Sequence, residues 1–114
     1  MTSERILLVD DDASLRKVLE FNLEQEGYTV VSASNGSEGL KFYDAENPDI
    51  VITDIKMPGM DGIDLLKEIK RRDIEKLVIV VTAFGTIDTA IEAMKLGAHD
   101  YITKPFNRDE LRLV

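Results

Sequence analysis

Neither cysteine nor tryptophan occurs in the sequence. Without cysteine, disulfide bonds and metal sites built from thiolates are excluded. Long hydrophobic runs are also missing, because the longest apolar runs have the length of one buried strand and not the ~20 residues that cross a membrane. Residues 1–5 lead directly into such a run, with no visible signal peptide. We therefore expect a cytoplasmic protein that makes no contact with membranes.

Positive charge is also in short supply. Lysine and arginine together number 14 against 22 aspartates and glutamates, which gives a formal net charge of −8 at pH 7. Binding to nucleic-acid phosphates needs clustered lysine and arginine, so we expect no direct nucleic-acid contact by this domain. The 44% apolar and 32% charged composition is typical of a folded globular chain. At 114 residues there is room for one core, and we assign residues 1–114 to a single domain.

Five short strand-like segments alternate with stretches of helical periodicity. The segments have the length and the β-prone composition of strands in a buried sheet. They cover residues 6–9, 28–33, 50–53, 77–81 and 101–103. Apolar residues at helical spacing predict the first three helices in between, and these residues are Leu15, Val18, Leu19 and Leu23, then Leu40 and Tyr43, then Ile63, Leu66 and Ile69.

Start and stop residues delimit the predicted helices. We expect the first helix to end at Gly27, the second to span about 37–45, and the third to begin after Asp61 as its N-cap. A fourth helix is predicted from Thr86 to Gly97, and it carries Ile87, Ala90, Ile91 and Met94. Asn107 with Glu110 resembles a capping box that opens a last helix.

The alternation of strands and helices indicates an α/β fold. A helix between consecutive strands forces them into parallel pairing through right-handed crossovers. We therefore predict a doubly wound, five-stranded parallel sheet with helices on both faces. Ligands of such sheets bind at the carboxyl ends of the strands, near the switch point in strand order.

Polar side chains follow the predicted strands at that edge. These are Asp10, Asp11 and Asp12 after the first strand, Asp54 after the third, Thr82 after the fourth and Lys104 after the fifth. If the fold brings these carboxylates close together, they cannot all stay ionised without a cation. A hard divalent ion such as Mg²⁺ suits oxygen ligands of this kind. A carboxylate can also attack a phosphoryl group. The ion, a lysine ammonium and a hydroxyl would then bind the charged phosphoryl oxygens.

Taken singly, each of these residues also has an ordinary explanation. Asp12 is equally well explained as the N-cap of the first helix. Thr82 fits a turn hydroxyl and Lys104 a solvated lysine. Their joint placement at the ends of four strands is what favours a phosphoryl-transfer site.

Four segments of the chain resemble the receiver domains of bacterial response regulators. They are Leu-Val-Asp-Asp-Asp at 8–12, Asp-Ile-Lys-Met-Pro-Gly-Met-Asp-Gly at 54–62, Val-Thr-Ala at 81–83 and Gly-Ala-His-Asp-Tyr-Ile-Thr-Lys-Pro-Phe at 97–106. The resemblance implies a flavodoxin-like strand order of 2-1-3-4-5. Receivers usually have a longer last helix than residues 107–114 allow, so we expect that helix to be short or truncated.

The resemblance also implies a phosphorylation site. Asp54 would be the phosphoacceptor, in a reaction that requires Mg²⁺ or Mn²⁺. Asp11 and Asp54 would bind the ion directly together with the backbone carbonyl of Lys56. Asp10 would act beside them through metal-bound water.

Further roles concern the phosphoryl oxygens and the switch. Thr82 and Lys104 would bind the oxygens, and the peptide bond from Lys104 to Pro105 would be cis. On phosphorylation Thr82 would move toward the phosphoryl group and Tyr101 would rotate inward, which changes the surface formed by the fourth helix, fifth strand and last helix. Phe84 would help to set the choice of partner.

The expected partners follow from the same resemblance. A sensor histidine kinase or a histidine phosphotransfer protein would donate the phosphoryl group, and the domain would slowly dephosphorylate itself instead of turning over an external substrate. Residues 82–98 are similar to receivers of nitrogen-regulator-class transcriptional activators, so we expect an effector domain that regulates transcription, and a homodimer on phosphorylation. Residues 54–62 are also similar to stand-alone phosphorelay intermediates.

Two other classes of function are compatible with the fold. A phosphatase of the haloacid-dehalogenase type would use Asp10 as its nucleophile, with Asp12 as the second acid. A flavodoxin-like cofactor binder or a non-phosphorylated interaction domain is the other alternative. Against a cofactor binder, no glycine-rich loop follows the first strand and no tryptophan is present to stack on a flavin.

Overall fold

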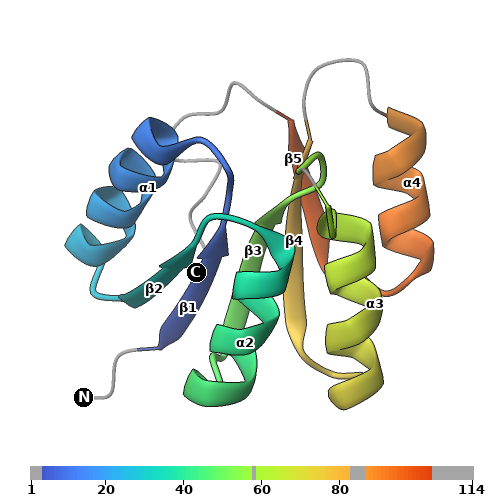
Figure 1. Ribbon diagram of the computed structural model, residues 1–114, viewed down its shortest axis with the longest axis horizontal. Coiled ribbons are helices and arrows are strands. Elements are labelled where there is room, and N and C mark those ends of the chain that lie inside the picture. The colour runs from blue at the N-terminus through green and yellow to red at the C-terminus, as the bar shows by residue number, and fades with distance from the viewer. Residues whose placement is uncertain (1–3, 58, 83–86, 104–114) are drawn as a thin grey trace.

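A computed structural model describes residues 4–57, 59–82 and 87–103 of the chain. Strands and helices alternate in it (Figure 1). The order is β1 (Arg5–Val9), α1 (Ala13–Gln25), β2 (Thr29–Ala33), α2 (Gly36–Glu46), β3 (Ile50–Asp54), α3 (Gly62–Arg72), β4 (Leu77–Thr82), α4 (Ile87–Lys95) and β5 (Asp100–Thr103). The predicted cap Thr86, Phe84, the Lys104–Pro105 peptide and the last helix lie outside the described residues.

The five strands form one parallel sheet in the order β2-β1-β3-β4-β5. This confirms the predicted fold class and strand order. β3 lies in the middle and every one of its five residues is buried. Its neighbours are β1 and β4, so a polar group at the end of β3 has the ends of both strands beside it.

Successive residues of each strand point to opposite faces of the sheet, and each face has its own core. Leu7 and Val9 of β1 pack with residues of α2, α3 and α4 on one face. Ile6 and Leu8 pack with Leu19 and other residues of α1 on the other face. Figure 1 shows this division, with α1 apart from α2, α3 and α4. Helices therefore cover both faces, as predicted.

The buried stripe of α3 is predicted correctly, because Ile63, Leu66 and Ile69 are all buried. The stripe of α1 is predicted only in part. Val18 fits the helical spacing, but its side chain is 56% exposed. The residues of α1 that face the sheet lie four positions apart (Leu15, Leu19 and Leu23), and a residue one position away points about 100° to the side of that row.

Helix α4 also differs from the expectation. Among its described side chains, the small ones of Ala90 and Ala93 are buried, whereas Ile91 and Met94 are 49% and 40% exposed. Alanine lets a helix lie close to the sheet, and Ile91 and Met94 then point away from the core. The sequence pattern alone favours such larger residues for burial, and for these two residues that preference is wrong.

Capping explains where the helices begin. Asn35 accepts a hydrogen bond from the backbone N–H of Glu38 and is the N-cap of α2, so this helix starts at Gly36, one residue before the predicted start. Asp61 caps α3 by accepting from the N–H of Asp64 at 2.9 Å, as predicted. Helices α1 and α4 are followed by Gly27 and Gly97, whose φ angles of 101° and 104° are favourable for glycine alone.

Ile69 provides a test of the core beneath α3. Replacing it by alanine should lower the free energy of unfolding by about 2–5 kcal/mol, because its side chain is fully buried and its loss leaves a cavity. Ile74 is a matched control, since the same substitution at this 74% exposed residue should change stability by less than about 0.5 kcal/mol. Urea unfolding followed by circular dichroism measures both, and equal losses would contradict the packing described.

Candidate functional site

Three carboxylates converge at the carboxyl edge of the sheet. Each of Asp10, Asp11 and Asp54 offers an oxygen, and these oxygens all lie within 4.8 Å of one another. The strand register brings them together, because Val9 of β1 pairs with Thr53 of β3 and the next residue of each strand is an aspartate. The structure therefore brings together Asp10 and Asp11, which follow β1, and Asp54, which ends β3.

The environment of this cluster is uneven. Asp10 and Asp54 are only 2% and 7% exposed, whereas Asp11 is exposed. Two buried carboxylates with a third beside them repel one another, and a bound cation relieves the repulsion. The donors are oxygens only, which is the ligand type that Mg²⁺ and Mn²⁺ prefer. The cluster therefore fits a hard divalent ion.

Hydrogen bonds hold Asp10 in place. Its N–H donates to the carbonyl of Ala33 at 3.1 Å, and its carboxylate accepts from the N–H of Asp12 at 2.9 Å. Its carbonyl oxygen accepts from the guanidinium of Arg16 at 2.7 Å. Sequence reasoning missed Arg16, because a half-exposed arginine on a helix gives no signal of a contact with the preceding loop.

Asp12 has a different role from its two neighbours. Its side chain accepts a hydrogen bond from the N–H of Leu15 at 3.1 Å and caps α1. The cluster of carboxylates does not include it. Of the two explanations left open by the sequence, the structure supports the cap.

The backbone at Asp54 is closely supported. The buried hydroxyl of Thr53 donates to the Asp54 carbonyl at 2.9 Å. Gly62, the first residue of α3, donates its N–H to the carbonyl of Ile55 at 2.7 Å. A Cβ atom at Gly62 would collide with the Asp54 carbonyl oxygen. In the sequence, Gly62 stood out only as part of the 54–62 segment and was given no role of its own.

The structure describes the other predicted site residues only in part. Thr82 is the last residue of β4 and pairs with Thr103 of β5, so its backbone lies at the same edge as Asp54; its side chain is not among those described. The Lys56 side chain is exposed. Tyr101 on β5 is 38% exposed. Lys104 lies outside the described residues.

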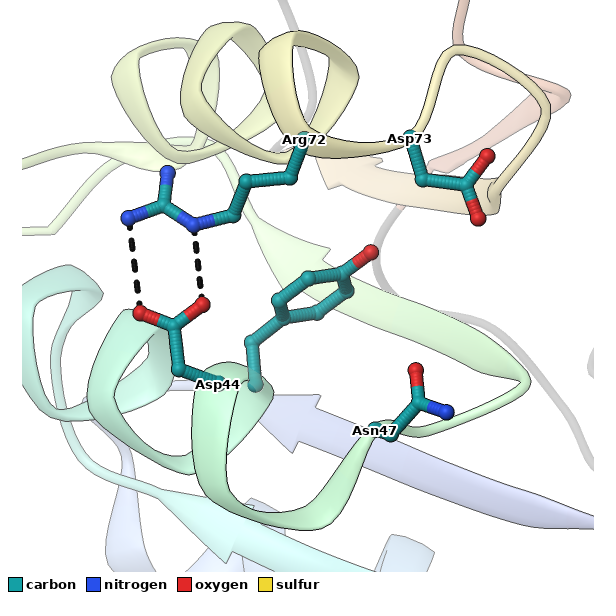
Figure 2. A pocket seen from close by; sticks show the side chains of 5 residues that line it. Asp44, Asn47, Arg72 and Asp73 are labelled. Atoms are coloured by element: carbon teal, nitrogen blue, oxygen red, sulfur yellow. Dashed lines mark hydrogen bonds and ion pairs between the residues drawn. The ribbon is translucent and has the colours of Figure 1, made fainter.

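A pocket of about 360 Å³ lies at the opposite edge of the sheet, between the ends of α2 and α3. Figure 2 shows Arg72 paired with Asp44, with Asn47 and Asp73 at the rim of the pocket. Tyr43 also lines the pocket. The Arg72 Nε lies 2.8 Å from the Asp44 carboxylate. None of the predicted site residues lines this pocket.

A sequence model of one protein family, described as "Response regulator receiver domain", matches residues 6–114. The chain belongs to this family. It is therefore a receiver domain of the kind found in two-component signalling systems. Among its described residues, no helix is long and apolar enough to cross a membrane.

Relatives of known type include transcriptional regulators and a phosphotransferase. The receiver domain is 47% identical over 110 residues to a probable transcriptional regulator, ycf27, of Guillardia theta, and the aligned residues make up 96% of this chain and 43% of that protein. It is 46% identical over 105 residues to the DNA-binding transcriptional regulator NtrC of Escherichia coli (strain K12), covering 92% of this chain and 22% of that protein. With sporulation initiation phosphotransferase F of Bacillus subtilis (strain 168) it shares 43% identity over 112 residues, covering 98% and 90% of the two chains.

A solved structure supports the same assignment. The receiver domain superposes on a response regulator receiver domain protein from Clostridium thermocellum with a TM-score of 0.92 at 40% identity, covering 95% of this chain and 87% of the other. The chain thus spans under half of the two regulators and nearly all of the phosphotransferase.

Two substitutions at Asp12 separate its role as an N-cap from the effect of its negative charge. Asp12→Ala removes the acceptor for the Leu15 N–H and should lower the free energy of unfolding by about 0.5–2 kcal/mol. Asp12→Asn keeps an acceptor of equal capping quality, so its stability should stay close to that of the wild type. Urea unfolding of the three proteins tests this, and equal losses in both variants would exclude the capping role.

Proposed function

We propose that this receiver domain accepts a phosphoryl group on Asp54, with the help of Mg²⁺ or Mn²⁺, and signals through a change of its surface. The observation that carries the proposal is the position of Asp54. It is a buried carboxylate at the end of the central strand, within 4.8 Å of the oxygens of Asp10 and Asp11. A carboxylate so placed is both a nucleophile and part of a cation site.

The acidic residues have different roles in the reaction. Asp11, Asp54 and the backbone carbonyl of Lys56 hold the ion, and Asp10 acts through a water molecule. A bound divalent ion supplies neutralisation of the charge on the transferring group. The Asp54 oxygen attacks phosphorus, the new oxygen–phosphorus bond forms, and the bond to the donor's histidine nitrogen breaks.

Two residues beyond the acids bind the transferred group. Thr82, at the end of the strand next to Asp54, and Lys104, which follows the neighbouring strand β5, supply a hydroxyl and an ammonium to the phosphoryl oxygens. In this proposal, the peptide bond between Lys104 and Pro105 is cis. Slow hydrolysis returns Asp54 to the free carboxylate, so the domain is a switch and has no external substrate.

The switch connects Asp54 to the outer surface. Thr82 moves toward the phosphoryl group and Tyr101, whose ring is part-exposed, turns inward. This changes the surface of α4, β5 and the segment that follows them. Phe84, two residues after Thr82 in the sequence, helps to set the choice of partner. The response is a shift between two populated states and not the creation of a new one.

The partners of the domain follow from its place in two-component signalling. A sensor histidine kinase or a histidine phosphotransfer protein in the cytoplasm supplies the phosphoryl group. The output is an effector domain that regulates transcription, and phosphorylation favours a homodimer. The similarity to the Bacillus subtilis phosphotransferase over 90% of its length supports a second arrangement, in which residues 1–114 form a stand-alone relay domain.

A haloacid-dehalogenase type of phosphatase is disfavoured by the contacts of its two acids. The Asp10 carboxylate accepts a hydrogen bond from the Asp12 N–H, and the Asp12 side chain caps α1. Both acids therefore have structural partners where that chemistry needs a nucleophile and a proton donor.

Intact mass after incubation with acetyl phosphate and Mg²⁺ tests the acceptor. One phosphoryl group should be added to the wild type, and none without a divalent ion or in Asp54→Asn. Asp73→Asn is the charge-matched control, because Asp73 lies at the opposite edge of the sheet, and it should be phosphorylated like the wild type. Addition that survives Asp54→Asn would rule out the assigned acceptor.

Tyrosine fluorescence tests the switch, since the sequence has three tyrosines and no tryptophan. Tyr101 is the most exposed of the three, so its inward rotation should make the emission of the phosphorylated domain harder to quench with acrylamide. Tyr101→Ala should still be phosphorylated by mass, should lose this change, and should bind its partner with less dependence on phosphorylation. Quenching that is equal in both states of the wild type would refute the rotation.

A further inference from the structure

Arg16 is the charged side chain that contacts the backbone of the acidic cluster from outside it. It lies in the first turns of α1 and is half-buried. Its guanidinium donates to the Asp10 carbonyl oxygen at 2.7 Å. A charged donor to a carbonyl makes a stronger hydrogen bond than a neutral one, so this contact is able to fix the local backbone.

The position of the accepting oxygen explains how this contact can affect Asp11. The Asp10 carbonyl belongs to the same planar peptide as the N–H of Asp11. Holding that oxygen therefore orients the peptide and the direction in which the Asp11 side chain leaves the backbone. Asp11 is exposed, so burial does not hold its carboxylate toward the buried Asp54.

Arg16 also interacts electrostatically with Glu38 in the first turn of α2. The pKa of Glu38 there is lowered, first by the N–H of Ser34, which donates to its carboxylate at 2.7 Å, and then by the Ser34 hydroxyl. The positive charge of Arg16 lowers it further. Arg16 thus has a favourable electrostatic interaction with Glu38 in addition to its hydrogen bond to the Asp10 carbonyl.

We infer that Arg16 is a positioning residue for the cation site: it orients the peptide between Asp10 and Asp11 so that Asp11 faces Asp54, and thereby raises the affinity for a divalent ion. This inference rests on the proposed function, in which Asp11 and Asp54 hold that ion.

Charge alone predicts the opposite effect, which makes the inference testable. A guanidinium beside a cation site repels the ion, so removing a positive charge should tighten ion binding. If Arg16 acts by orienting the backbone, removing it should weaken ion binding instead. Lys17, an exposed residue of the same helix, is a matched control for the loss of one positive charge.

The experiment measures Mn²⁺ affinity from the spin-resonance signal of the free ion, for wild type, Arg16→Met, Arg16→Lys and Lys17→Met. Arg16→Met should raise the dissociation constant about three- to tenfold, the equivalent of one hydrogen bond. Arg16→Lys keeps one donor and should recover part of the loss. Lys17→Met should stay within about twofold of the wild type, or bind slightly tighter as its charge is lost.

A second readout needs no metal. In the ion-free proteins, the amide ¹⁵N–¹H shifts of Asp11 and Asp12 should move in Arg16→Met and stay nearly unchanged in Lys17→Met, because only the first substitution releases the peptide. Should Arg16→Met not fold, Arg16→Lys carries the test, with a smaller loss of affinity and smaller shifts.

The outcomes separate this inference from the proposed function. Wild-type protein that binds no Mn²⁺ would remove the cation site itself. Wild type that binds Mn²⁺, with Arg16→Met or Arg16→Lys binding as tightly or more tightly and unchanged amide shifts, would overturn the role of Arg16 alone.

Discussion

Parallel pairing between β1 and β3 is the constraint on which the site depends. Val9 lies opposite Thr53, so the residues that follow, Asp10 and Asp54, end side by side at the carboxyl edge. A slip of one residue would turn a whole strand's side chains to the other face of the sheet. The two cores prevent this slip, because alternate residues of β1 are fully buried on opposite faces. The fold's hydrophobic packing thus fixes the geometry of its charges.

Burying two carboxylates has a cost, and the surroundings are arranged to meet it. Hydrogen bonds from the Asp12 N–H and Arg16 hold Asp10 at its carboxylate and carbonyl. Thr53 and the absence of a side chain at Gly62 allow the Asp54 backbone to lie where it does. The acids lie together without an ion, so the binding of the proposed divalent ion would need less ordering of these side chains.

Two kinds of feature could be predicted from the sequence, namely regular apolar patterns and polar residues at the ends of apolar runs. Strand positions, α3's buried stripe and the strand order followed from periodicity and resemblance, and the acidic residues stood out because polar groups ended successive apolar runs. The exposure of Val18, Ile91 and Met94 was not foreseen, because periodicity says which residues share a face but not how closely that face approaches the sheet. Arg16 and Gly62 were missed for another reason. Each acts on the backbone of a residue in a different element, and such contacts leave no pattern in a single sequence.

The packing of α4 bears on how the proposed signal reaches the surface. Ala90 and Ala93 are buried in α4, whereas Ile91 and Met94 are exposed in part, and α4 contacts β5, which carries the part-exposed Tyr101. Asp54 pairs with Val81 of β4, and Val81 pairs with Ile102 of β5, so only one strand separates the acceptor from that surface. In the described sheet β5 has one neighbour where β3 has two. A charge added at the central strand would therefore reach the β5 edge through β4 alone, and Tyr101 on that edge is part-exposed.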